Sequence, residues 1–203
     1  KKFAAVTPIS IDHQDYLGNS LSQIAFEKLG ILNHKSINFI NKQKPKVMKF
    51  IKDQLNKRKL EAQIFNHEWA IRSDTYFSKQ VKINLSKLSL LGKHQKFNAG
   101  LAIHLAKNIL KDSFDIVTTE KALEKCQWPG RLQLIDKGSI PKKIIKYKNI
   151  YLDGFHNIDG MKVLMESLNS NKKILICSFL NNKKYRYMLS NLSKKFQKII
   201  VVK

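Results

Sequence analysis

The chain has 203 residues, of which 43% are hydrophobic and 26% charged, a composition typical of a globular protein large enough to bury a core. No apolar run approaches the length of a membrane-spanning helix, and the opening residues KKFAAVTPIS do not form a secretory signal. Cys126 and Cys177 lie far apart in the sequence and form neither a zinc motif nor a disulfide framework, so we expect a cytoplasmic location.

The formal net charge of +23 would ordinarily suggest a nucleic-acid partner. Only Arg58, Arg72, Arg131 and Arg186 are arginines among the 38 basic residues, although arginine is the usual residue for bidentate and stacking contacts with nucleic acids. Lysine, asparagine and isoleucine all have A/T-rich codons, and all three are abundant. The charge therefore indicates compositional drift spread over solvated faces, and nucleic acid is not the expected partner.

Short apolar runs alternate with amphipathic segments along the chain, which predicts an α/β fold. Ser20 and Gln23 have the spacing of a capping box, so a helix is expected from Leu21 to Gly30. Pro45 is expected in the first turn of a second helix. Its buried stripe should be Val47, Phe50, Ile51 and Leu55.

Between Glu61 and Asn84 the pattern changes to short extended runs, AQIF, WAIRS and QVKINL, which predict a small antiparallel meander. A helix is expected next from Asn98 to Leu110, and another from Thr119 to Cys126. On the first of these, one face should carry Leu101, Ala102, Leu105 and Ile109.

The segment WPGRLQLI, with Pro129 and Gly130, is the expected hinge between a domain of residues 1–127 and one of residues 128–203. The lysine-rich stretch KGSIPKKIIKYKN after it is expected to be a surface loop. A βαβαβ run should follow, with strands NIYLD, KILICSFL and KIIVV and helices from Asp159 to Leu168 and from Lys183 to Phe196. Its uniformly apolar strands predict a parallel sheet covered on both faces.

Four segments carry polar residues that packing alone does not explain. In SIDHQDYLGNSLSQIAFEKLGI, His13 lies at the carboxyl end of an expected strand, an edge where ligands bind in open α/β sheets. Lys28 shares a helical stripe with Ile24, so its stem should be buried. Ordinary structural roles remain open for both: a histidine bonded to backbone, and a lysine whose stem covers apolar surface.

The other three segments leave similar alternatives open. In LLGKHQKFNAGLA, the residues Gly92, His94, Gln95 and Asn98 exceed what capping a helix requires. In WPGR, Arg131 follows a rigid turn and could be a simple surface arginine. In LDGFHNIDG, residues Asp153, His156 and Asn157 occupy a strand-to-helix loop, which is either an ordinary turn or a nucleotide or metal contact.

These four motifs, in this order, resemble the folylpolyglutamate synthase/dihydrofolate synthase family of the Mur-ligase superfamily, and the resemblance runs from about Ile9 to Phe196. It implies a three-layer, Mur-ligase-like α/β fold. The chain would hold the later part of the ATP-binding central domain, followed by the first βαβαβ portion of a Rossmann-like C-terminal domain.

The resemblance also implies the chemistry. ATP would phosphorylate a carboxylate of folate or dihydropteroate, and L-glutamate would then displace the phosphate to form an amide. His13 and Lys28 would serve the Mg²⁺ site, Lys28 as the lysine that this superfamily carbamylates. Asn98 would hydrogen-bond the adenine of ATP, and His94 and Gln95 would line the nucleotide pocket. Three residues of the C-terminal domain would close over ATP: Arg131, Asp153 and His156. The catalytic residues would be Lys28, Arg131 and His156.

The sequence departs from the family pattern in one important respect, because it contains no GxxxxGK(S/T) phosphate-binding loop. The chain also stops at Lys203 after three expected strands of the C-terminal domain, where family members continue, so we expect it to be the middle portion of such a ligase. Without the phosphate-binding loop it is expected to be inactive alone. One alternative is a ligase reconstituted with a separately encoded N-terminal fragment that supplies the loop. A basic nucleic-acid-binding module is the alternative from another class, and no membrane partner is expected.

Overall fold

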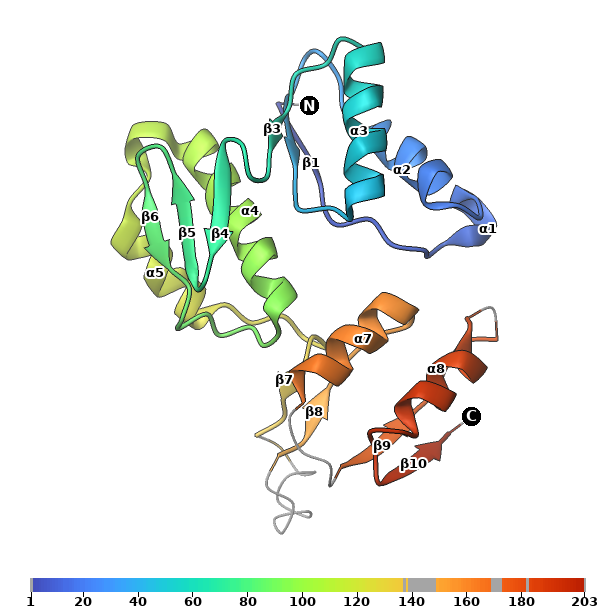
Figure 1. Ribbon diagram of the computed structural model, residues 1–203. Helices are drawn as coiled ribbons and strands as arrows, with labels where there is room; N and C mark the ends of the chain where they lie inside the picture. The colour runs from blue at the N-terminus through green and yellow to red at the C-terminus, as the bar shows by residue number, and fades with distance from the viewer. Residues whose placement is uncertain (1, 137, 139–148, 169–172, 182, 203) are drawn as a thin grey trace. The chain divides into compact units, whose positions relative to one another are not determined.

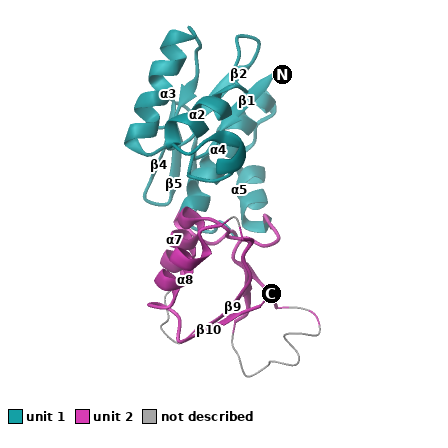
Figure 2. Cartoon of the chain, turned by 90° about the vertical axis from the view of Figure 1, so that its right-hand side faces the viewer, with its two compact units in different colours: residues 1–89, 94–125 teal, residues 90–93, 126–203 magenta. Residues whose placement is uncertain are grey.

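A computed structural model describes residues 2–136, 138, 149–168, 173–181 and 183–202. The chain divides into two compact units (Figure 2). Unit 1 comprises residues 1–89 and 94–125, and unit 2 comprises residues 90–93 and 126–203. Most of the lysine-rich stretch expected to be a surface loop lies outside the described residues.

The centre of unit 1 is a parallel sheet in the order β1-β2-β3, formed by β1 (Phe3–Val6), β2 (Ile37–Ile40) and β3 (Gln63–Ile64) (Figure 1). Its register pairs Phe3 with Ile37 and Phe39 with Gln63. The prediction for AQIF was therefore wrong in its pairing, because β3 joins the parallel sheet and not the meander. Hydrogen bonds between strands join segments that are distant in the sequence, so the residues AQIF alone do not indicate which strand they pair with.

Successive residues of these strands enter opposite cores, as the two-residue period of a strand requires. Ala4 and Val6 pack with Ile40 against helices α2 (Leu21–Leu29) and α3 (Pro45–Lys57). On the other face, Phe39 packs with Trp69 and Tyr76. The sheet is therefore the middle layer of unit 1.

The first helices form where local signals place them. A four-residue helix, α1 (Gln14–Leu17), comes first; α2 then begins after Ser20, whose Oγ accepts from the Gln23 N–H at 3.2 Å. The Gln23 Oε1 accepts in turn from the Ser20 N–H at 3.1 Å, which completes the capping box. Helix α3 starts with Pro45, and its buried residues are Val47, Ile51 and Leu55.

The third layer combines an antiparallel meander with two helices. The meander is β4 (Trp69–Arg72), β5 (Thr75–Ser78) and β6 (Lys82–Asn84), and its central strand TYFS was absent from the predicted runs. Helix α4 (Lys93–Leu110) covers it and is followed by the 3-10 turn η1 (Lys111–Ser113) and by α5 (Ile116–Lys125).

The buried face of α4 differs from the predicted one. It is formed by Gln95, Ala99, Gly100, Leu101, Ile103 and His104. Ala102 and Ile109 are exposed instead. Gly100 explains the difference, since a Cβ there would lie 2.8 Å from both the Trp69 Cζ3 and the Ile71 Cδ1. Helix α4 therefore contacts the meander at Gly100, its smallest residue. The periodicity of apolar residues cannot predict a contact made by a glycine.

In the described part of unit 2, four strands form two short sheets, and two helices pack together. β7 (Gln133–Leu134) pairs antiparallel with β8 (Tyr151–Leu152), and β9 (Ile174–Cys177) pairs parallel with β10 (Lys198–Val201). The helices are α7 (Ile158–Ser167) and α8 (Tyr185–Leu192), and they pack around Met161, Leu164, Met188 and Leu192.

Two expectations for unit 2 need correction. In the ladders that the structure describes, the strand in NIYLD pairs antiparallel with β7 and not with a parallel neighbour. The β9–β10 pair is also covered on one side only in the described part of the chain, where Ile174, Ile176 and Ile200 are 52%, 66% and 38% exposed. Apolar strand residues mark a sheet interior, but they do not say which segment covers each face.

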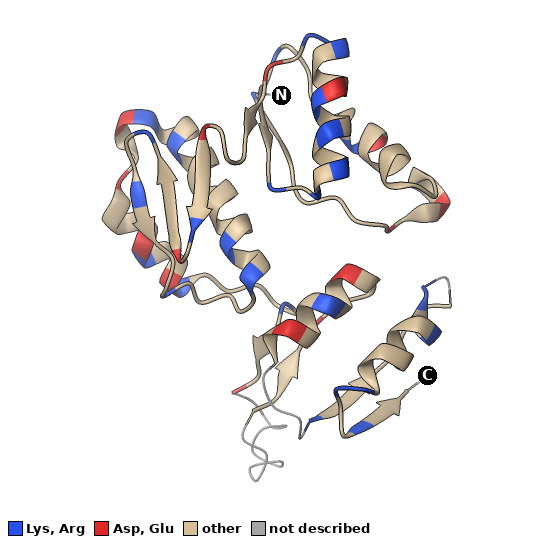
Figure 3. Cartoon of the chain, in the orientation of Figure 1, with Lys and Arg blue, Asp and Glu red and all other residues tan. Residues whose placement is uncertain are grey.

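No helix among the described residues is long and apolar enough to span a membrane. Lys and Arg residues lie on helices and strands of both units, and Asp and Glu lie among them on several elements (Figure 3). A spread of this kind is typical of charged residues on solvated faces.

Candidate functional site: polar residues after β1, on α4 and around α7

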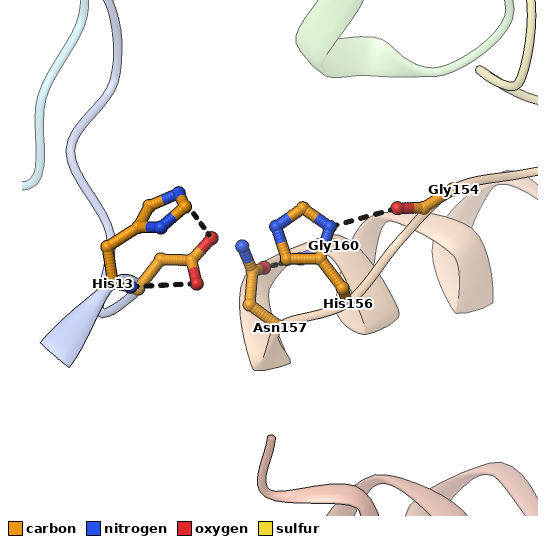
Figure 4. Close-up of polar contacts among 6 residues, drawn as sticks. His13, Gly154, His156, Asn157 and Gly160 are labelled. Atoms are coloured by element: carbon orange, nitrogen blue, oxygen red, sulfur yellow. Dashed lines mark hydrogen bonds and ion pairs between the residues drawn. The ribbon is translucent and has the colours of Figure 1, made fainter. Parts of the chain in front are cut away.

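His13 follows the loop after β1 and has a left-handed backbone, with φ 52° and ψ 39°. Its N–H donates to the Asp12 Oδ1 at 2.9 Å, and its Nε2 lies 3.8 Å from the Asp12 Oδ2 (Figure 4). The imidazole is 58% exposed and the Asp12 side chain 15% exposed. A carboxylate and an imidazole therefore lie side by side with an open approach.

Asp12 was not among the predicted site residues. Its signal was present in the sequence, because it immediately precedes His13 in the DH pair. A carboxylate oxygen is a better Mg²⁺ ligand than an imidazole nitrogen, since Mg²⁺ is a hard cation. Asp12 therefore belongs with His13 in any metal site here.

Lys28 lies in the last turn of α2 and is exposed, so the expectation of a buried stem was wrong. The buried residues of α2 are Ile24, Ala25 and Leu29. In the last turn of α2, Leu29 contacts the core, and its neighbour Lys28 lies outside the buried stripe. Its amine is consequently accessible to solvent and to small solutes.

His94, Gln95 and Asn98, the predicted nucleotide-binding residues of this segment, lie in the first two turns of α4. Gln95 is buried, and its Oε1 accepts from the Asn98 Nδ2 at 3.1 Å. The Asn41 Nδ2, just after β2, donates to the Phe97 carbonyl at 3.2 Å, which ties this part of α4 to the carboxyl end of β2. Asn98 and His94 are thus held at the edge of the parallel sheet where ligands bind in α/β folds.

A buried polar network lies one turn further along α4. The His104 Nε2 lies 2.6 Å from the Gln63 Oε1, and its Nδ1 lies 2.8 Å from the Tyr76 hydroxyl. Because the Gln63 oxygen only accepts, the Nε2 carries the proton and the Nδ1 accepts from Tyr76. Burial, assisted by the charge of Lys107, lowers the pKa of His104 to about 4, and burial raises the pKa of Tyr76. Both groups are therefore neutral at pH 7 and serve the core.

In unit 2 the predicted residues lie in two loops that are bonded to each other. Asp153 accepts from the Leu132 N–H at 2.8 Å and from the Phe155 N–H at 2.9 Å. Arg131 is exposed next to Leu132. The structure thus brings the WPGR and LDGFHN segments together, as their shared assignment to one site requires.

The loop after β8 leads into α7 with an ordered start. The Asn157 Oδ1 accepts from the Gly160 N–H at 2.8 Å and caps the helix (Figure 4). The His156 Nδ1 lies 3.0 Å from the Gly154 carbonyl, so this nitrogen carries the proton and the Nε2 is the basic one. Asn157 therefore has a structural role at the start of α7.

A hollow of about 280 Å³ lies beyond β2 and β3 in unit 1. Its lining includes Lys42, Met48, Lys52, Phe65 and His67, and the Lys52 Nζ lies 3.3 Å from the His67 Nε2. None of the eight predicted site residues lines it, so this hollow is separate from the candidate site.

Comparison with known proteins identifies the fold and the family. A folylpolyglutamate synthase from Mycobacterium tuberculosis, solved with ADP, has a TM-score of 0.81 and 24% identity over 98% of this chain and 46% of its own. The dihydrofolate synthase/folylpolyglutamate synthase of Bacillus subtilis is 29% identical over 92% of this chain and 45% of its own length. Folylpolyglutamate synthase of Saccharomyces cerevisiae is 30% identical over 84% of this chain and 31% of its own length. No family model matches the chain.

The chain has the Mur-ligase-like α/β fold of the solved folylpolyglutamate synthases. The chain belongs to the folylpolyglutamate synthase/dihydrofolate synthase family, and it spans less than half the length of each of these relatives.

Proposed function

We propose that the chain is part of an ATP-dependent ligase that joins L-glutamate to folate or to dihydropteroate. The observation that carries this proposal is the similarity to the B. subtilis dihydrofolate synthase/folylpolyglutamate synthase over 92% of the chain. The bound ADP in the M. tuberculosis relative supports ATP as the nucleotide.

The reaction has two steps. A substrate carboxylate oxygen attacks the γ-phosphorus of ATP, the bond from that phosphorus to ADP breaks, and an acyl phosphate forms. The amine of glutamate, after losing a proton, then attacks the acyl carbon, and inorganic phosphate leaves as the amide forms. Both steps bring anions together, so the site must supply positive charge.

Three polar side chains of unit 1 and unit 2 would bind the nucleotide at its two ends. Asn98 presents its Oδ1 to the exocyclic amine of adenine, because its Nδ2 is oriented by Gln95. Arg131 offsets charge on the phosphates, and the exposed position of its side chain permits this. His156 lies in the loop whose Gly154 N–H donates to the Gly130 carbonyl next to Arg131, so it would approach the same part of the nucleotide.

Asp12 and His13 are the residues of unit 1 that would hold Mg²⁺, and their adjacent oxygen and nitrogen donors fit such an ion. Bound Mg²⁺ would neutralise phosphate charge. Lys28 would join them only as a carbamate: its neutral amine adds CO₂, a proton is lost, and two oxygen donors replace an ammonium that would repel the metal. The exposure of Lys28 leaves its amine open to CO₂.

The test is reconstitution. The 203-residue chain contains no phosphate-binding loop, and one missing electrostatic element typically costs roughly 10²–10³-fold in rate, so the chain alone should show no turnover. Mixed with the N-terminal half of the B. subtilis relative, it should release ADP only when both L-glutamate and a folate or dihydropteroate are present. Chromatography of the glutamylated product measures the reaction and shows which substrate is used.

Arg131→Ala should abolish the reconstituted activity, whereas His34→Ala, at an exposed histidine outside the site, should leave it unchanged. Turnover by the chain alone would contradict the expected inactivity. Failure of the mixture to bind ATP, with both parts folded by circular dichroism, would overturn the proposed function.

A further inference from the structure

The segment that carries Arg131 has an unusual backbone. Gly130 has φ +70° and Leu132 has φ +45°. Glycine adopts such angles freely, but the Cβ of leucine meets the following carbonyl, so Leu132 keeps this conformation only where its surroundings impose it. The direction of the chain at Arg131 therefore depends on whatever holds Leu132.

Two interactions hold Leu132. Its side chain is 4% exposed and packs in the core of unit 2 with Met161 and Leu164. Its N–H donates to the Asp153 Oδ2 at 2.8 Å, outside the ladder of β7 and β8, which begins at Gln133. The side-chain bond replaces the strand bond that this N–H would otherwise need.

The same carboxylate also holds the loop that carries His156. The Asp153 Oδ1 accepts from the Phe155 N–H at 2.9 Å, and the neighbouring Gly154 N–H donates to the Gly130 carbonyl at 2.8 Å. One carboxylate thus joins the backbone before His156 to the backbone after Arg131. Each of its oxygens accepts one of these backbone bonds.

We propose that Asp153 is a positioning residue, which holds Leu132 in the left-handed conformation and thereby sets the direction of Arg131 relative to His156. This inference rests on the proposed function, in which Arg131 and His156 meet the nucleotide. It differs from the expectation that Asp153 acts by touching the nucleotide itself, and the two roles give different results in variants.

The first experiment needs no ligand. Amide hydrogen exchange in the whole 203-residue chain should show the Leu132 and Phe155 amides protected, and Asp153→Asn should reduce the protection of both by about tenfold or more. Asp136→Asn, which removes an exposed carboxylate of the same unit, should change neither. Exchange of either amide at the rate of an unstructured peptide in the unaltered chain would overturn the proposal, whether or not the variants fold.

The second experiment is a double-mutant cycle on the affinity for Mg²⁺-ATP, measured by calorimetry. If Asp153 acts through Arg131, Asp153→Asn should weaken binding by about tenfold in the unaltered chain and by less than about twofold in the Arg131→Ala chain. Equal losses in both backgrounds would show direct contact and overturn the proposal. If the unaltered chain does not bind ATP, nucleotide binding by this chain fails, and the exchange experiment still decides the role of Asp153.

Discussion

At the scale of single residues, His104 shows how burial selects a protonation state. Its imidazole is 5% exposed, bonded to Tyr76 and Gln63, and stacked on Trp69 with ring centroids 5.6 Å apart. The Gln63 oxygen satisfies its one N–H, and the Tyr76 hydroxyl satisfies its lone pair. A proton added at Nδ1 would force Tyr76 to accept where it now donates and would place a charge in the core.

Folding stability should therefore fall with acidification. The pKa of His104 is about 4 in the folded chain against an ordinary 6.5, so this contribution to stability is complete above pH 6.5 and is lost as the pH falls from 6.5 to 4. The loss should be about 3 kcal/mol, since one pKa unit corresponds to about 1.4 kcal/mol. Urea unfolding followed by the fluorescence of Trp69, measured at several pH values from 4 to 6.5, gives the free energy of unfolding of unit 1 across this range.

His104→Gln should flatten this pH dependence, while His34→Gln, at an exposed histidine, should preserve it. An equally steep dependence in the His104 variant would assign the effect to other groups.

At the scale of elements, the contact between α4 and β4 depends on one glycine. The Trp69 ring is 2% exposed and cannot move away from a new methyl group, whereas Ile71 presents the end of a flexible side chain. Alanine is the better helix former by about 1 kcal/mol, but overpacking a rigid core typically costs about 1–3 kcal/mol. The steric effect should win.

Gly100→Ala should therefore destabilise unit 1 by about 1–2 kcal/mol in chemical denaturation. Ala102→Gly, at an exposed position of the same helix, measures the effect of helix propensity alone. In the double variant Gly100→Ala/Ile71→Val, the shorter side chain at position 71 should restore part of the lost free energy of unfolding. A stabilised Gly100→Ala would show that the helix shifts freely on the meander.

At the scale of the whole molecule, the charge of +23 should act through electrostatics without sequence recognition. Binding to a duplex should be equal for unrelated sequences and should weaken steeply with salt, by about 10³-fold or more between 50 and 200 mM if six or more phosphates are contacted. Fluorescence anisotropy at two salt concentrations with two sequences measures both properties. A preference for one sequence that persists at the higher salt would revive a nucleic-acid-binding function.

The sequence by itself determined the features that are encoded locally. Ser20, Gln23 and Pro45 specify helix starts within a few residues, and the four ordered motifs were sufficient to indicate the ligase family. The roles assigned to His13, Lys28, His94, Gln95, Asn98, Arg131, Asp153 and His156 remain predictions.

The pairing of segments and the burial of faces became known from the three-dimensional structure. β3 joins a parallel sheet, α4 packs along Gly100, and Lys28 lies outside the buried stripe of α2. It also showed that the Asp153 carboxylate binds the Leu132 N–H, 21 residues away in the sequence. The physical reason is common to all of them: burial and non-local hydrogen bonds depend on what the rest of the chain brings alongside a segment, and that information is absent from the segment's own pattern.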